Sequence, residues 1–191
     1  MQCCKDDFIG GKSCGCPTIG QPAPSFTGVT AYEQGKRDFT EVGLADYRGS
    51  WLVLFFYPRD FTFICPTEIR GFATKESEFS ALSAKVLACS TDSAWSHKNW
   101  FERDLQDVHY PVLADTTHEV AEAYGVYNAQ DGLAERGLFI IDPEGILRYI
   151  VVSSGSVGRS VDETLRVLKA LQTGELCPVE WTEGTKTLGK A

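Results

Sequence analysis

The sequence predicts an α/β fold, in which a central mixed β-sheet is flanked by helices on both faces. Between residues 51 and 90, an apolar run, an amphipathic segment and a second apolar run follow one another, which is typical of a parallel strand–helix–strand crossover. Near residue 143, a Pro-Glu-Gly turn separates two further apolar runs, which is typical of an antiparallel hairpin. Parallel and antiparallel pairs together make the predicted sheet mixed.

The first predicted strand is the apolar run 51–57, and the second is the run 86–90. Between them, apolar residues are spaced as on one face of a single helix. Pro66 suits the first position of that helix, because no backbone N–H is needed there. The residues of this face are Ile69, Phe72, Ala73, Phe79 and Leu82.

The middle of the chain continues the alternation. We expect a helix over 93–103 and a short strand over 112–114. Thr116 and Glu119 form a capping-box pattern, which predicts a helix that ends near Tyr124.

The last elements are the hairpin and a closing helix. The hairpin strands are predicted over 138–142 and 146–152. Ser160 and Glu163 form a second capping box, and the helix it opens has its apolar face at Val161, Leu165, Leu168 and Leu171. A crossover, a helix, a hairpin and a closing helix, in this order, are typical of a thioredoxin-like fold.

The length of 191 residues suits one domain with short tails. Residues 1–17 hold four cysteines and almost no periodic apolar pattern, so we expect an irregular N-terminal tail there. We expect the thioredoxin-like domain over residues 18–172 and a C-terminal tail over residues 173–191.

The charge balance argues against several kinds of partner. The chain has 26 acidic and 18 basic residues, a net charge of −8, and no run of Lys or Arg. Such a surface repels nucleic acid and anionic membranes. No apolar run is long enough to span a bilayer, and the N-terminus resembles neither a signal peptide nor a transit peptide. We therefore expect a cytoplasmic protein with no nucleic-acid or membrane partner.

The seven cysteines are too few for a disulfide scaffold at this length, so we expect thiols that react or stay reduced. Cys65 lies where a strand meets a helix. The free N–H groups of a first helical turn favour a thiolate, which is the nucleophilic form of cysteine. A buried structural cysteine would fit the same position, and the strand pattern around Cys89 predicts core packing for that residue.

The neighbours of Cys65 favour the reactive interpretation. Pro58, Thr62 and Cys65 form the pattern P-x-x-x-T-x-x-C, which continues as Cys-Pro-Thr-Glu. This resembles the active-site motif of the peroxiredoxins, specifically the typical 2-Cys class that includes the bacterial alkyl hydroperoxide reductase peroxidase subunit. The resemblance implies that Cys65 attacks a peroxide and becomes a sulfenic acid. Thr62 would hydrogen-bond the sulfur or the peroxide, and Pro58 would shield the site without adding a donor.

Two charged residues acquire roles through the same resemblance. Arg136 begins the pattern R-G-L-F-I-I-D and matches the family's active-site arginine, and Glu68 matches the glutamate that orients it. Such an arginine would stabilise charge on the leaving oxygen. Without the resemblance, Arg136 is a strand-end arginine facing water, and Glu68 complements the helix dipole. His97 and Trp100 resemble a family segment near the site, although a surface histidine and a packing tryptophan fit at least as well.

Cys177 lies in the pattern G-E-x-C-P-x-x-W, which resembles the family's resolving segment. The resemblance implies that Cys177 of a partner subunit condenses with the sulfenic acid of Cys65, so that a disulfide links two chains head to tail. Trp181 would anchor this tail by burying its aromatic surface. The resemblance further implies a homodimer and a decameric ring of dimers.

The expected activity is the reduction of hydrogen peroxide and alkyl hydroperoxides. A dithiol protein such as thioredoxin, or a flavoprotein disulfide reductase, would recycle the enzyme, and no cofactor or metal is needed. Four N-terminal thiols would be enough for a zinc site, but their spacing is not C-x-x-C. Auxiliary redox thiols and an inert tail are the alternatives, and we favour the inert tail; the four are Cys3, Cys4, Cys14 and Cys16.

Two other functions are alternatives to a peroxidase. A redox-regulated chaperone or redox-relay assembly would use the same fold. A thioredoxin-like disulfide reductase is disfavoured, because Cys65 is followed by Pro-Thr-Glu and not by a second cysteine at C-x-x-C spacing. Relatives sensitive to over-oxidation carry a Gly-Gly-Leu-Gly loop and a C-terminal Tyr-Phe helix. The corresponding loop, 101–111, lacks that sequence and the printed chain ends without Tyr-Phe, so we expect resistance to over-oxidation.

Overall fold

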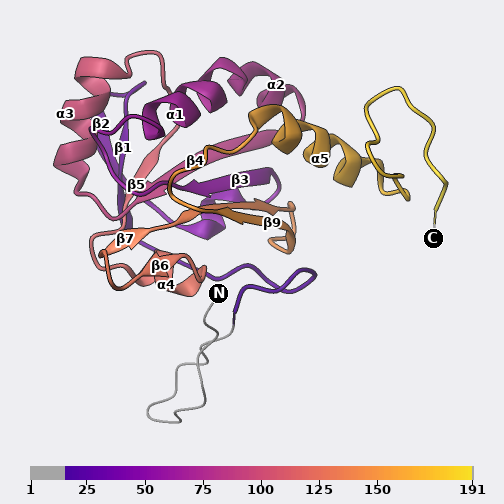
Figure 1. The fold of residues 1–191 in the computed structure, drawn as a ribbon, viewed down its shortest axis with the longest axis horizontal. Coiled ribbons are helices and arrows are strands. Elements are labelled where there is room, and N and C mark those ends of the chain that lie inside the picture. Colours follow the sequence, from indigo (N-terminus) through magenta and orange to yellow (C-terminus); the bar gives the residue numbers. More distant parts are fainter. Residues whose placement is uncertain (1–15, 191) are drawn as a thin grey trace, which may run out of the picture.

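The computed structural model describes residues 16–190, and its centre is a seven-stranded sheet (Figure 1). The strand order is β2-β1-β5-β4-β3-β8-β9. The pairs β3–β4 and β4–β5 are parallel and the other pairs are antiparallel, which confirms the predicted mixed sheet. The strands are β1 (Val29–Glu33), β2 (Asp38–Val42), β3 (Trp51–Phe56), β4 (Ala84–Ser90), β5 (Val112–Ala114), β8 (Arg136–Ile141) and β9 (Leu147–Ser153).

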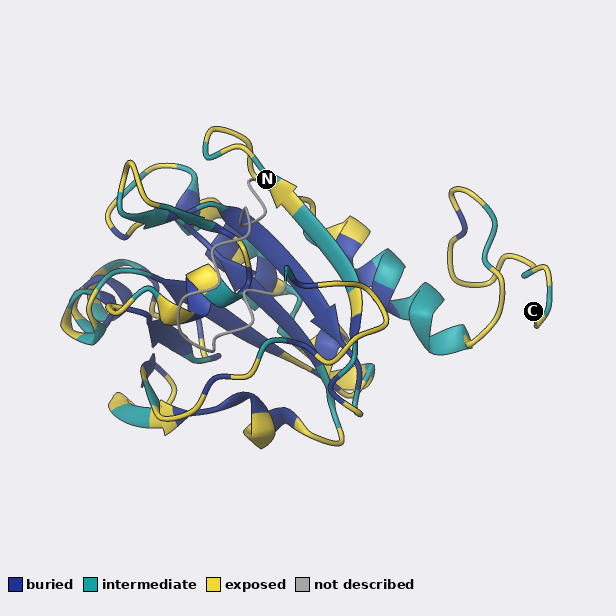
Figure 2. Ribbon diagram, turned by 90° about the horizontal axis from the view of Figure 1, so that it is seen from below, coloured by how far each residue is buried: buried dark blue, intermediate teal, exposed yellow. Residues whose placement is uncertain are grey.

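Side chains of the central strand alternate between two hydrophobic layers. Val53 and Phe55 of β3 point into one layer, where they meet α1, α2, α3 and α5. Leu52, Leu54 and Phe56 point into the other layer, which is covered by η1, α4 and extended segments. Figure 2 shows the central strands of the sheet as buried and an edge strand as partly exposed. The helices are η1 (Leu44–Tyr47), α1 (Cys65–Thr74), α2 (Glu76–Ala81), α3 (Ala94–Asp104), α4 (Glu119–Ala123) and α5 (Val161–Thr173).

The single helix predicted after the first strand is in fact two helices. Lys75 separates α1 from α2, and its backbone torsions (φ −102°, ψ 7°) lie outside the helical range. Phe72 before the break and Phe79 after it both enter the same hydrophobic layer. The apolar spacing therefore continues across the break, which is why it predicted one helix.

The predicted capping box at Thr116 is wrong. The helix α4 begins at Glu119, and His118 precedes it in a left-handed conformation with φ 65°. Asp115 provides the cap, because its carboxylate accepts the backbone N–H groups of Val120 at 3.1 Å and Ala121 at 2.7 Å.

Of the two hydrogen bonds of the capping box predicted at Ser160 and Glu163, one is present. The Ser160 hydroxyl accepts the backbone N–H of Glu163 at 3.1 Å, as at the start of a capped helix. The Glu163 carboxylate does not accept the backbone N–H of Ser160; it forms an ion pair with Arg166 at 2.6 Å.

Four short strands were not predicted. The hairpin of β1 and β2 joins the sheet through β5. A separate two-stranded ribbon is formed by β6 (Tyr127–Asn128) and β7 (Leu133–Ala134), and it leads directly into β8.

Candidate active site

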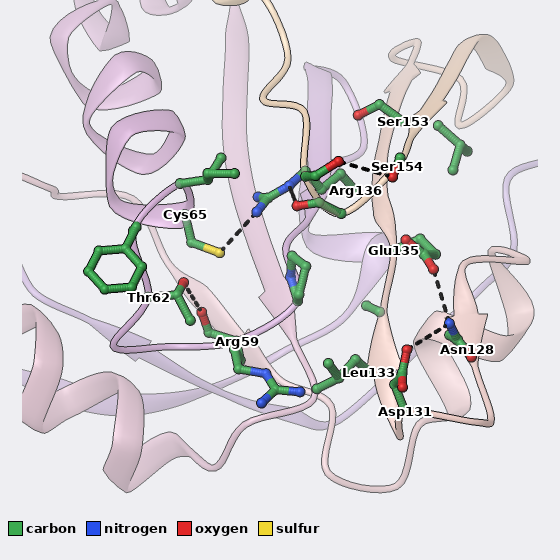
Figure 3. A pocket seen from close by; sticks show the side chains of 17 residues that line it. Arg59, Thr62, Cys65, Asn128, Asp131, Leu133, Glu135, Arg136, Ser153 and Ser154 are labelled. Carbon is green, nitrogen blue, oxygen red and sulfur yellow. Dashed lines mark hydrogen bonds between the residues drawn. The ribbon is translucent and has the colours of Figure 1, made fainter.

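Cys65 is the first residue of α1, at the junction with the segment that leaves β3. This is the strand-to-helix position that the sequence predicted. The residue is only 1% exposed, and its sulfur faces the cavity shown in Figure 3. Pro66 is the second residue of the helix, one position later than predicted and still within the first turn.

Arg136 faces the sulfur from the first position of β8. Its Nη2 lies 3.5 Å from Cys65 Sγ (Figure 3). Nη1 donates to Glu68 in a buried ion pair, and Nε donates to the Gly155 carbonyl at 2.8 Å. The side chain is 3% exposed, so the alternative of a water-facing arginine is wrong.

A second arginine shares the same carboxylate. Nε and the backbone N–H of Arg159 each lie 2.8 Å from Glu68 Oε1, and Nη1 of Arg159 donates to the Gly137 carbonyl at 2.5 Å. Burial raises the pKa of the Glu68 carboxyl, but Arg159 and Arg136 outweigh burial and bring the pKa below its usual value. Sequence reasoning missed Arg159, which lies in a loop without periodic pattern and gives no signal of burial.

Thr62 and Pro58 line the same cavity as Cys65. The Thr62 hydroxyl donates to the Arg59 carbonyl at 3.1 Å, so its hydrogen is not directed at the sulfur. The hydroxyl oxygen can still accept a hydrogen bond from a peroxide. The structure thus brings Pro58 and Thr62 to the mouth of the site and holds Glu68 behind it.

The cavity itself has a volume of about 760 Å³. Its far wall comes from the β6–β7 ribbon, where Asn128 donates to the carboxylates of Asp131 and Glu135 at 3.1 Å each (Figure 3). Leu133 of the same ribbon adds an apolar surface. The cavity therefore accommodates molecules much larger than hydrogen peroxide.

Cys177 lies elsewhere in the same chain. It follows α5 and is half-buried in a groove of about 430 Å³ that shares no lining residue with the Cys65 cavity. The Thr173 hydroxyl lies 3.5 Å from its sulfur. Trp181 of the same tail is buried, and its indole Nε1 donates to the Thr185 carbonyl at 3.0 Å. Figure 1 shows this tail standing apart from the sheet at the end of α5.

His97 and Cys89 both lie in the interior. His97 is fully buried on α3, so the interpretation as a surface histidine is wrong. Trp100 is also buried, as a packing residue would be. Cys89 is buried in β4, and burial together with Asp115 raises the pKa of its thiol, so the prediction of core packing is confirmed.

The N-terminal cysteines Cys3, Cys4 and Cys14 lie outside the described residues. Within residues 16–190, no group of His, Cys, Asp or Glu has the arrangement of a metal site. In the same part of the chain, none of the helices reaches the length and apolar character that a membrane span requires.

A buried thiol at a helix start, faced by a fixed guanidinium beside an open cavity, defines a site for thiol-based redox chemistry. The model of the AhpC/TSA family matches residues 19–150. A putative peroxiredoxin in the rubredoxin operon of Clostridium pasteurianum is 52% identical over 175 residues, covering 89% of this chain and 98% of its own. The thioredoxin peroxidase of Trypanosoma brucei rhodesiense is 49% identical over 185 residues, covering 92% of each chain.

Solved structures agree with these relatives. Reduced 2-Cys peroxiredoxin of Plasmodium vivax superposes with a TM-score of 0.84 at 34% identity, covering 90% of this chain and 93% of that one. AhpC of Mycobacterium bovis gives a TM-score of 0.79 at 40% identity, covering 87% and 99%. The chain belongs to the AhpC/TSA family of peroxiredoxins. The predicted thioredoxin-like fold and the predicted function as a thiol-dependent peroxidase are thereby confirmed.

Proposed function

We propose that the chain reduces hydrogen peroxide and alkyl hydroperoxides with Cys65 as the attacking thiol. The observation that carries this assignment is the 3.5 Å contact between Arg136 Nη2 and Cys65 Sγ at the cavity. The thiolate sulfur bonds to one peroxide oxygen while the O–O bond breaks. The other oxygen leaves with a proton as water or an alcohol, and Cys65 becomes a sulfenic acid.

The surrounding residues act on the oxygens. Arg136 stabilises the charge that develops on the leaving oxygen, and Glu68 keeps that guanidinium in place. The Thr62 oxygen accepts a hydrogen bond from the peroxide and so orients the O–O bond. Pro58 limits access of water without adding a competing donor.

The resolving thiol in this proposal is Cys177 of a partner subunit. Cys65 and Cys177 of one chain line different cavities, which favours a bond between chains. The Cys177 sulfur attacks the sulfenic sulfur and water leaves, so that an intersubunit disulfide forms. Thioredoxin or a flavoprotein disulfide reductase then returns both thiols. We propose a homodimer assembled into a ring of dimers, working in a reducing compartment such as the cytoplasm.

The first test concerns Cys65. Cys65→Ser should abolish peroxide consumption even in excess dithiothreitol, because the replacement hydroxyl is a far weaker nucleophile at neutral pH. Cys89→Ala is the matched control, since it removes a buried thiol outside the cavity, and it should keep turnover. Continued turnover by Cys65→Ser would falsify the assignment.

The second test separates Cys177 from Cys65. Cys177→Ser should react once with peroxide and still be recycled by small thiols, but not by protein dithiol donors. Peroxide-treated wild type should run as a covalent dimer on a non-reducing gel, and Cys177→Ser should run as a monomer. An oxidised wild type that stays monomeric, with an intrachain bond found by mass spectrometry, would rule out the partner's role.

A further inference from the structure

A buried polar cluster lies behind the cavity and takes no part in the reaction described above. At its centre, Asp60 and His97 are in hydrogen-bond contact, with Oδ2 and Nδ1 2.8 Å apart and side chains 1% and 0% exposed. The other carboxylate oxygen, Oδ1, accepts the Tyr57 hydroxyl at 2.8 Å. Oδ2 also accepts the Ser96 hydroxyl at 2.7 Å.

Hydrogen-bond partners surround both members of the pair. The second ring nitrogen of His97, Nε2, lies 3.2 Å from the Leu113 carbonyl oxygen. Both ring nitrogens therefore face oxygen atoms of neighbouring groups. The Asp60 carboxylate, in turn, is surrounded by donors from Tyr57, Ser96 and His97. A buried polar network whose members all have hydrogen-bond partners holds its two elements in a fixed relation.

The two elements in question are α3 and the segment that carries the reactive thiol. His97 lies on α3, and Asp60 lies between β3 and Cys65. The backbone N–H of Asp60 also donates a hydrogen bond to Asp92 Oδ2 at 2.7 Å. The next residue, Phe61, has φ 55°, a left-handed conformation that a bulky side chain rarely adopts. Such a conformation persists when the surroundings enforce it, and the bonds at Asp60 supply that constraint.

This segment also has to move during the catalytic cycle. A disulfide requires the two sulfurs to lie about 2 Å apart. Cys65 is 1% exposed and Arg136 contacts its sulfur, so a thiol carried on another protein chain, unlike a free peroxide, reaches the sulfur only after the start of α1 opens. The reaction with peroxide needs the closed arrangement, and disulfide formation needs the open one.

We propose that Asp60 and His97 are positioning residues that clamp the segment 58–64 in its closed arrangement. The clamp speeds the attack of Cys65 on peroxide, and it slows the opening that leads to the disulfide. The inference rests on the proposed roles of Cys65 and Cys177, and it adds a control point between the two steps.

The test is to measure the two steps separately in Asp60→Asn, which keeps the size of the side chain but removes its charge. Stopped-flow fluorescence follows the reaction of Cys65 with hydrogen peroxide, and alkylation with non-reducing gels follows disulfide formation. The first rate should fall about tenfold or more, because displacement of a catalytic group by a fraction of an ångström has effects of that order. The second rate should rise. These changes of opposite sign identify a clamp.

Asp142→Asn is the matched control for general destabilisation. Asp142 is also a buried carboxylate with a basic partner, Arg148, whose Nε lies 2.6 Å from its Oδ2, at the turn between β8 and β9. This variant should keep both rates at wild-type values even if its melting temperature falls. Tyr57→Phe, which removes one hydroxyl from Asp60, should shift both rates in the same directions as Asp60→Asn but less, and it serves where Asp60→Asn fails to fold.

Two results would overturn the inference. The first is that both rates, the reaction with peroxide and disulfide formation, stay at wild-type values in Asp60→Asn or, where that variant fails to fold, in Tyr57→Phe. The other is an Asp142→Asn variant that shifts both rates as Asp60→Asn does. Turnover in Cys65→Ser would instead remove the proposed function itself, so the two failures are distinguishable.

Discussion

At the scale of single residues, Arg136 contacts Cys65 although the two are 71 positions apart in the chain. Its guanidinium is already fixed by Glu68 and by the Gly155 carbonyl, so it needs no reorganisation when charge develops on the leaving oxygen. Arg136→Ala should therefore lower the second-order rate with peroxide about a hundredfold or more. Stopped-flow kinetics under pseudo-first-order conditions measures this.

Arg148 supplies the control for Arg136. It pairs with Asp142 at 2.6 Å and is 44% exposed on β9. Arg148→Ala should leave the rate with peroxide unchanged, since the side chain does not line the Cys65 cavity. If Arg136→Ala also kept the wild-type rate, the guanidinium would have no part in the chemical step.

Glu68 gives the molecule a stability that depends on pH. Arg159 and Arg136 lower the pKa of its carboxyl in the folded chain below the usual 4.5, despite burial. Its contribution is therefore present above the pKa of the unfolded chain and is lost as pH falls through the lower pKa of the folded chain. The free energy of unfolding of Glu68→Gln, from urea titrations, should be lower than wild type at neutral pH, and the difference should shrink as the pH falls through the lowered pKa of the folded chain. A difference independent of pH would contradict this.

The sequence predicted some residues of the site and missed others. Cys65 and Arg136 belong to recognisable motifs, and the structure brings them together. Arg159 could not be found, because a Ser-Val-Gly-Arg-Ser stretch has no periodicity and its burial arises only when the loop folds over Glu68. His97 was misjudged because a polar residue on an amphipathic helix usually faces water, and its buried partner Asp60 lies on another segment.

At the scale of elements, the start of α5 depends on one side chain. The Ser160 hydroxyl binds the Glu163 N–H, which would otherwise lack an intrahelical partner. Ser160→Ala should lower the free energy of unfolding by about 1 kcal/mol. Urea denaturation followed by circular dichroism measures the change. Ser80→Ala, at an exposed site within α2, should leave stability unchanged or slightly higher, because alanine is the better helix former. Equal losses in both variants would contradict the cap.

The elements that escaped prediction share a physical cause. The strands β1 and β2 are half-exposed, with burial that does not alternate cleanly along either strand. Their pairing depends on contact with β5, which is distant in sequence. At α4, Asp115 and Thr116 are both residues that favour helix starts, and the structure, in which His118 is left-handed, has Asp115 as the cap.

At the scale of the whole molecule, the tail after α5 bears on resistance to peroxide. Residues 174–190 contain no helix or strand and stand apart from the sheet in both views (Figures 1 and 2). A segment with few buried contacts has low local stability and opens readily. During turnover at about millimolar peroxide, Cys65 should therefore reach the disulfide before a second peroxide converts it to the sulfinic acid.

Mass spectrometry of Cys65 checks this expectation. Wild type should show disulfide, and Cys177→Ser should show sulfinic acid under the same conditions, because it lacks the proposed resolving thiol. Rapid accumulation of sulfinic acid in wild type, with loss of activity, would show that the tail opens too slowly.

The sheet could be predicted at this scale, and the relation between the two thiols could not. The run 51–57 and the first hairpin strand, β8, are apolar enough to predict directly, since each is buried on both faces or nearly so. The second hairpin strand, β9, is only partly buried, but the turn before it marks its start. The separation of Cys65 from Cys177 depends on where α5 ends relative to the sheet, and no local pattern encodes that placement.

The shared carboxylate behind Cys65 also has an electrical consequence. Two guanidinium groups, Arg136 and Arg159, face a single carboxylate, Glu68, and all three are nearly dry. With Cys65 as a thiolate the four charges sum to zero, so the closed site is neutral. Once the sulfur is oxidised to a neutral sulfenic acid, one positive charge is left without a counterion in a medium of low dielectric constant, which is unfavourable. We therefore expect oxidation of Cys65 to weaken the closed arrangement just when the proposed disulfide requires the chain to open.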